Sequence, residues 1–352
     1  MEKNRLEISR LYNRFGFGPK PGEFSADLKA GLKKTQNKIL KISENDPGLN
    51  ETKDLNLSDL GQRPKPNSAE IIDFATSLRN DRDQLTLWWL DRMVLGNYGL
   101  KEKMTWFWHG HWATSIKKVD FPLVMYKQNQ TLRANSLGNF KVMSRAMVND
   151  GALQIWLDGQ TNSVKSPNEN LGRELMELFT IGVNRYSEDD VKAAARALTG
   201  YQVVRSNGLV TLNQKRQDTN AISILGTTNT FTGETLSDFL VDRPDCENFI
   251  AERIWYRFIS STEPMPANFV AKKAFSKREI YPAITAAAKS NLLANPKYEL
   301  VKSPVEWFVA SCRALELVPS KLETSGRLFN YLDKLGQVPF APPNVGGWPA
   351  ES

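Results

Sequence analysis

A chain of 352 residues with 41% hydrophobic and 24% charged residues has the composition of a globular protein that can bury a large core. No stretch approaches the ~18 consecutive apolar residues of a membrane span, and the N-terminus lacks the apolar segment of a secretory signal, which predicts a cytoplasmic protein unless a leader was trimmed. The net charge of +7 is dispersed without a solid basic block, which argues against nucleic acid as a partner.

Helical periodicity dominates the first 200 residues. Ser68 and Ser187 precede two of the periodic segments and are their expected N-caps. Residues 44–68 are polar and rich in Pro, Gly and Asn, which predicts an exposed loop. The expected helices span residues 8–18, 21–42, 69–97, 100–112, 121–138, 139–150, 168–182 and 186–200.

The pattern changes after residue 200. Short β-branched runs at 201–205, 209–213 and 221–225, the first two flanking "SNG", predict a small hairpin or three-stranded insertion near 201–226. Helices resume near residue 233, and the chain ends on a Pro- and Gly-rich stretch, "PFAPPNVGGWPAES". We therefore expect one mainly α-helical domain over 1–352, truncated at its C-terminus, with further helices at 246–260, 278–293, 303–317 and 324–336.

The chain contains two histidines, His109 and His111, in the tripeptide "HGH". Imidazole is a common ligand of divalent metals such as Zn, Fe or Mn and titrates near neutral pH. On a continuous helix the two rings would point about 200° apart, so a shared metal requires the helix to end or kink at Gly110. Otherwise one histidine packs among the neighbouring Trp108 and Trp112 and the other is solvated.

The stretch "PNENLGRELMELF" offers a third metal ligand. A helical wheel places Asn170 and Glu174 at the edge of its apolar stripe, so Glu174 should be half-buried and in need of a partner. That partner is either a metal held with the histidines or an arginine, from Arg133, Arg145 or Arg196. Glu174 and its neighbour Arg173 are the catalytic candidates of a metal-assisted reaction.

Other polar residues lie within apolar surroundings and complete the candidate pocket. Gln128 and Arg133 belong to the otherwise apolar segment "MYKQNQTLR", and Asp158 follows an aromatic residue in "IWLDGQTN". Cys246 and Cys312 match no metal-binding spacing, which predicts free buried thiols.

Several long motifs together resemble a large bacterial family called domain of unknown function 1800. These motifs are "RLYNRFGFGPKPGE", "EKMTWFWHGHWATS", "MYKQNQTLR", "NENLGRELMELFTIGVNRYSEDDVKAAARALTGY", "KSPVEW" and "PPNVGGWP". The resemblance runs from about residue 8 to the last residue and implies a mostly α-helical protein. It also implies export for many members and a sulfatase-like protein as a partner in a pathway on extracellular polymers.

One departure from the family bears on the metal prediction. The family often carries a His-Asp pair before the "LG" that corresponds to Leu225–Gly226, whereas this chain has Gln217 and Asp218 near that position. If that histidine were a third ligand, the site of this chain would be altered.

Two functions follow from these patterns. The first is a metal-assisted enzyme, a hydrolase or oxidase, in which His109, His111 and Glu174 hold the metal. The second is a non-catalytic binding or assembly module, in which the tryptophans form a core or a sugar-stacking groove. A glycosidase is less well supported, because Glu169, Glu174 and Glu177 share one helix whereas a catalytic carboxylate pair flanks its substrate.

Overall fold

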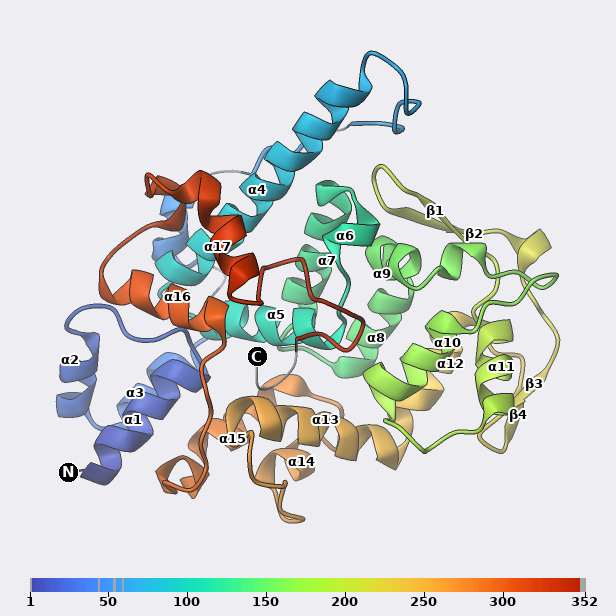
Figure 1. The fold of residues 1–352 in the computed structure, drawn as a ribbon. Helices are drawn as coiled ribbons and strands as arrows, with labels where there is room; N and C mark the ends of the chain where they lie inside the picture. The colour runs from blue at the N-terminus through green and yellow to red at the C-terminus, as the bar shows by residue number, and fades with distance from the viewer. Residues whose placement is uncertain (1, 44, 53–54, 59, 349–352) are drawn as a thin grey trace.

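The computed structural model describes residues 2–43, 45–52, 55–58 and 60–348, and shows a mainly α-helical protein with two small antiparallel sheets (Figure 1). Among the described helices, none combines the length and the hydropathy that a membrane span needs. The helices are α1 Glu2–Arg14, α2 Glu23–Ala30, α3 Leu32–Ile39, α4 Ile71–Leu95, α5 Leu100–His111, α6 Ile116–Val119, α7 Pro122–Asn135, α8 Phe140–Val148, α9 Gly151–Trp156, α10 Asn170–Glu174, α11 Glu188–Ala197, α12 Gly233–Asp242, α13 Pro244–Phe258, α14 Val270–Ala274, α15 Ile280–Lys289, α16 Pro304–Ala314 and α17 Leu328–Lys334.

Helix α5 runs through the middle of the molecule and contributes to both hydrophobic clusters of the core (Figure 1). Trp108 belongs to the larger cluster, with side chains of α8, α13 and α15. Trp106 belongs to the second cluster, with side chains of α4, α16 and α17. Because apolar side chains occur all around α5, the helix is buried on every side, which explains why its sequence is so rich in aromatic residues.

Two of the expected helical features differ in the structure. The segment predicted as one helix over 21–42 is divided by Gly31, whose φ of 89° is incompatible with a helix and ends α2 before α3 begins. Ser68 does not cap α4: the N-cap is Glu70, without a side-chain hydrogen bond, and the helix begins at Ile71. Ser187 does cap α11, through a capping box with Asp190, as predicted.

The β insertion lies where the sequence predicts it. Strands β1 Tyr201–Val204 and β2 Leu209–Leu212 pair as a hairpin around the "SNG" turn. The third predicted strand, β3 Ile222–Ile224, pairs instead with β4 Thr227–Asn229. The sequence analysis did not predict β4, a three-residue strand whose two threonines are too short a β-branched run to stand out. The insertion is therefore two separate two-stranded sheets.

Two further segments depart from simple expectations. After α10, the chain continues as a π-helical turn over Leu175–Thr180 rather than as regular α-helix. The predicted exposed loop 44–68 is partly buried: Asp46 accepts hydrogen bonds from three backbone amides, and Leu57 packs against the second core cluster. Residues 44, 53, 54 and 59 of this loop lie outside the described residues.

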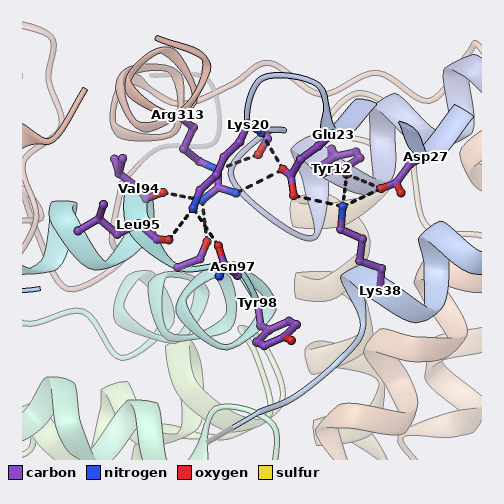
Figure 2. A network of polar contacts seen from close by, with 12 residues as sticks. Tyr12, Lys20, Glu23, Asp27, Lys38, Val94, Leu95, Asn97, Tyr98 and Arg313 are labelled. Atoms are coloured by element: carbon purple, nitrogen blue, oxygen red, sulfur yellow. Dashed lines mark hydrogen bonds and ion pairs between the residues drawn. The ribbon is translucent and has the colours of Figure 1, made fainter. Parts of the chain in front are cut away.

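A polar network fixes the N-terminal helices against the rest of the molecule (Figure 2). Lys38 of α3 binds Asp27 of α2 at 3.0 Å, and Tyr12 of α1 donates to the same carboxylate. Lys20 donates to the carbonyl of Leu95 at 2.8 Å, and Arg313 of α16 donates to the carbonyl of Val94 at 2.7 Å. The hydrogen bond of Tyr12 holds α1 against α2, and residues elsewhere on α1 line the cavity described below.

Candidate functional site

The two histidines lie on different sides of a continuous helix, because α5 extends to His111 without a break at Gly110. The ring of His109 packs against Trp89, Trp106, Phe340 and Trp348. The ring of His111 packs against Phe107, Trp108, Trp112, Phe140, Phe179 and Phe249. Among the described residues, the two rings have no aromatic neighbour in common.

Each histidine makes its own backbone hydrogen bond. Nε2 of His109 accepts from the amide of Phe340 at 3.1 Å, and Nε2 of His111 lies 3.0 Å from the carbonyl oxygen of Phe179. A carbonyl can only accept, so Nε2 of His111 carries the proton and Nδ1 is left as an acceptor. Burial lowers the pKa of both imidazoles to about 3, with Arg253 adding to the effect at His111.

The metal assignment to His109, His111 and Glu174 gains no geometric support from this arrangement. Within the ranges that the structure describes, no group of three or more His, Cys, Asp or Glu side chains is placed to hold a metal ion. The rings point away from one another, which is the geometry expected of a two-residue spacing on an uninterrupted helix. The metal therefore stays a prediction from the sequence.

Glu174 is partly buried, as its position on the helical wheel predicts, and burial followed by the charge of Glu177 raises its pKa. The arginines expected as its partners bind other carboxylates: Arg133 binds Glu102 at 2.9 Å, Arg145 binds Asp238 and Arg196 binds Asp218 at 2.7 Å. No hydrogen bond or ion pair links Glu174 to either histidine in the described part of the chain.

Most of the other predicted site residues serve the structure at separate places. Buried Trp108 donates to the carbonyl of Ser136, and Gln128 donates to Asp150. Exposed or partly exposed groups bind neighbours on the surface: Arg173 binds Glu188, Asp158 binds Lys118, and the amide of Asn170 donates to Asn168. Trp112 is fully buried, and its indole nitrogen has no partner among the described residues.

His111 is the one predicted site residue that lines a large cavity, of about 510 Å³. The wall is built by α1, α5 and α13, by residues 299–306 leading into α16, and by the C-terminal segment at Gln337, Gly346 and Trp348. Four of the motifs that carry the family resemblance thus meet here: "RLYNR", "WFWHGH", "KSPVE" and "GGW". Segments far apart in the sequence therefore form the cavity together.

The C-terminal segment is seated tightly on α5. Trp348 stacks on Trp106 with ring centroids 4.9 Å apart. Gly347 has a φ of +82°, and a Cβ atom there would lie 2.3 Å from the carbonyl oxygen of Gly110. Only glycine allows this approach, so the glycine pair of "NVGGW" positions Trp348 as a wall of the cavity.

The cavity carries a large excess of positive charge. Its lining contains two carboxylates, Glu299 and Glu306, and six cationic side chains. The cations are Arg10, Arg14, Lys103, Arg253, Arg257 and Lys302.

Four of these cations are engaged by the protein itself. Arg10 and Arg14 donate to backbone carbonyls, with distances of 2.9 Å to Leu293 and 2.6 Å to Ile259. Lys103 and Arg257 share Glu306, and burial lowers the pKa of Lys103 to about 8. One carboxylate therefore compensates two cations. Within the part of the chain that the structure describes, the two α1 arginines hydrogen-bond to backbone carbonyl groups and to no carboxylate.

Arg253 has no such partner. Its Nε is buried without an acceptor, and its terminal nitrogens, which make no hydrogen bond or ion pair within the described residues, are not among the buried unpaired atoms and so remain accessible. Its visible contact is the face of the Phe249 ring, 5.1 Å from the guanidinium carbon. Burial lowers its pKa from the ordinary value, yet a guanidinium remains charged at neutral pH. The accessible terminal nitrogens of this partly buried charge are therefore free to bind an acceptor in the cavity.

Two pairs of arginines in the sequence indicate this site, although the motif and helical-wheel arguments did not use them. Arg10 and Arg14 are four residues apart on α1, and Arg253 and Arg257 are four residues apart on α13. Like charges at this spacing share a helix face and repel one another. Two such pairs on otherwise amphipathic helices indicate a face that receives negative charge.

The comparisons with known proteins match nearly the whole chain to one family. A family model described as "Protein of unknown function (DUF1800)" matches residues 10–352. No curated protein and no solved structure matches the chain.

Proposed function

Since the chain belongs to the DUF1800 family, whose description assigns no activity, we propose a function from the cavity itself: the protein binds an anionic ligand between α1, α5 and α13. The observation that carries this proposal is the guanidinium of Arg253, which lines the cavity without an acceptor. An anionic group of the ligand would supply that acceptor and offset the excess positive charge of the lining.

The size and walls of the cavity favour a small ligand or the end of a chain. A volume of about 510 Å³ is in the range of pockets for small organic molecules. The aromatic residues Trp348 and Tyr256 line the same cavity as the cations, so the ligand would contact apolar faces as well as charges. This proposal is closer to the binding-module alternative than to the metal-assisted enzyme, and it concerns a cavity that the sequence did not identify.

A titration of the full-length chain tests the proposal. Sodium sulfate, sodium phosphate and sodium glucuronate are added at constant ionic strength, and binding is followed by calorimetry and by tryptophan fluorescence, since Trp348 and Trp106 line the cavity. Arg253→Gln should weaken binding at least about tenfold, because a hydrogen-bonded charge is lost. Arg205→Gln removes the same charge from the exposed end of β1–β2 and serves as the matched control.

Two results would overturn the proposal. One is the absence of binding by all three anions; the other is equal affinity in wild type and Arg253→Gln. The metal-assisted chemistry, the sulfatase-like partner and the cellular location remain predictions from the sequence, and anion binding in the cavity depends on none of them.

A further inference from the structure

The cavity follows one face of helix α5. The residues that this helix contributes to the lining follow the i, i+3, i+4, i+7, i+8 pattern of a single helix face: they are Lys103, Trp106, Phe107, Gly110 and His111. The step from Lys103 to His111 is two turns of the helix, or about 12 Å along its axis. The cavity is therefore elongated, with one end at Lys103 and the other at His111.

The cation at the His111 end is Arg253. Burial lowers the pKa of His111 to about 3, and the charge of Arg253 adds to this effect, which places the guanidinium close to the ring. Both groups also contact Phe249, whose ring centroid lies 5.1 Å from the guanidinium carbon and 6.1 Å from the centroid of the imidazole. The accessible terminal nitrogens of Arg253 form a planar fork, which matches a single carboxylate.

The Lys103 end holds a second excess of positive charge. Burial lowers the pKa of Lys103 to about 8, and the charges of Arg257 and Lys302 add to this effect, so the three cations lie near one another. Glu306 is shared by Lys103 and Arg257. Lys302 is exposed, and in the described part of the chain its ammonium makes no hydrogen bond or ion pair. Lys302 is therefore free to bind an anionic group at this end.

We propose that the ligand of the cavity is an elongated dicarboxylate that lies along α5, with one carboxylate on Arg253 and the other on Lys302. This inference rests on the anion-binding function proposed above and specifies its ligand. Between the two ends, α5 contributes the aromatic residues Trp106 and Phe107 to the lining, which favours an apolar body between the two carboxylates. A small anion such as sulfate reaches one end at a time, whereas a ligand with two charged ends binds both and gains from the second contact.

The experiment compares three probes on the full-length chain by calorimetry at constant ionic strength: suberate, its monomethyl ester and succinate. Suberate should bind at least about tenfold more tightly than either of the others, because the ester has lost one charge and succinate is too short to bridge the two ends. Lys302→Gln should lower the affinity for suberate to about that for the ester, since the second carboxylate then has no cation to bind. Lys165→Gln removes the same charge from an exposed lysine outside the cavity and should change none of the three affinities. Melting temperatures show that both variants are folded.

The possible failures are distinguishable. Equal affinity of the wild type for suberate and its monomethyl ester would overturn the second anionic contact and leave anion binding standing. A preference for suberate that Lys302→Gln retains would overturn the assignment of that contact to Lys302. Succinate that binds as tightly as suberate would overturn the elongated ligand. If none of these acids and no sulfate binds, the anion-binding function itself fails.

Discussion

Lowering the pH from 7.5 to 5.0 should destabilise this protein through its two buried histidines. Burial lowers the pKa of His109 and His111 to about 3 in the folded state, whereas in the unfolded chain both rings return to the ordinary value of about 6.5. The unfolded state therefore binds protons first. The contribution of the two neutral histidines to the free energy of unfolding is fully present above pH 6.5 and is lost as the pH decreases from 6.5 toward 3.

The magnitude follows from these two values. At pH 5.0 each ring lies about 1.5 pH units below its unfolded pKa, which corresponds to a loss of about 2 kcal/mol per histidine and about 4 kcal/mol for both. Asp150 opposes this loss, because burial raises its pKa to about 6 and its protonation at pH 5.0 returns about 1.4 kcal/mol. Glu102 and Glu306, with pKa values lowered to about 2, lose their contribution only below about pH 4.5. The net loss should be about 2–3 kcal/mol.

The assay is urea unfolding of the full-length chain at pH 7.5 and 5.0, followed by tryptophan fluorescence and circular dichroism, with EDTA present so that metal release does not contribute. The chain has no other histidine, so His109→Gln and His111→Gln divide the effect directly. Each should reduce the difference between the two pH values by about 2 kcal/mol. Stability that is equal or greater at pH 5.0 in the wild type would refute the reasoning, since it would mean that the imidazoles protonate in the folded state.

Three other outcomes are expected. Asp150→Asn should stabilise the protein by roughly 1–3 kcal/mol at pH 8 and by much less at pH 4.5, as measured by urea unfolding. The reason is that asparagine still caps α9 but removes a buried carboxylate whose pKa is raised. An equal gain at both pH values would contradict this explanation. Glu102→Gln should cost about 3–5 kcal/mol, seen as a lower melting temperature, since it leaves the buried guanidinium of Arg133 without its carboxylate. Glu177→Gln, at a partly exposed residue of the π-helical turn whose partner Tyr186 can still donate to glutamine, is the control. If the sequence-based metal prediction holds, elemental analysis of untagged protein will find zinc, iron or manganese, and His109→Ala and His111→Ala will each lower its content; a wild type that binds none of these metals on addition ends that prediction.

Local features of the sequence were sufficient to predict most of the secondary structure. The capping box at Ser187, the β-branched runs around "SNG" and the periodic segments each act through neighbours a few residues away, so they are readable without a fold. The errors have local causes as well. Gly31 adopts a positive φ that a periodic pattern does not reveal, and Ser68 is followed by a turn rather than by the first turn of α4.

The site depended on tertiary structure. The sequence singled out the "HGH" stretch as unusual, but it did not decide whether α5 breaks at Gly110. In the folded protein α5 continues through Gly110, and Gly347 packs directly against the carbonyl group of that residue. Arg14 and Arg253 lie 239 positions apart in the sequence, and nothing local indicates that they face one cavity. Nε of Arg253 lacks an acceptor because no acceptor among the described residues lies within hydrogen-bond distance of it. Those distances are set by the folded chain and cannot be read from the sequence.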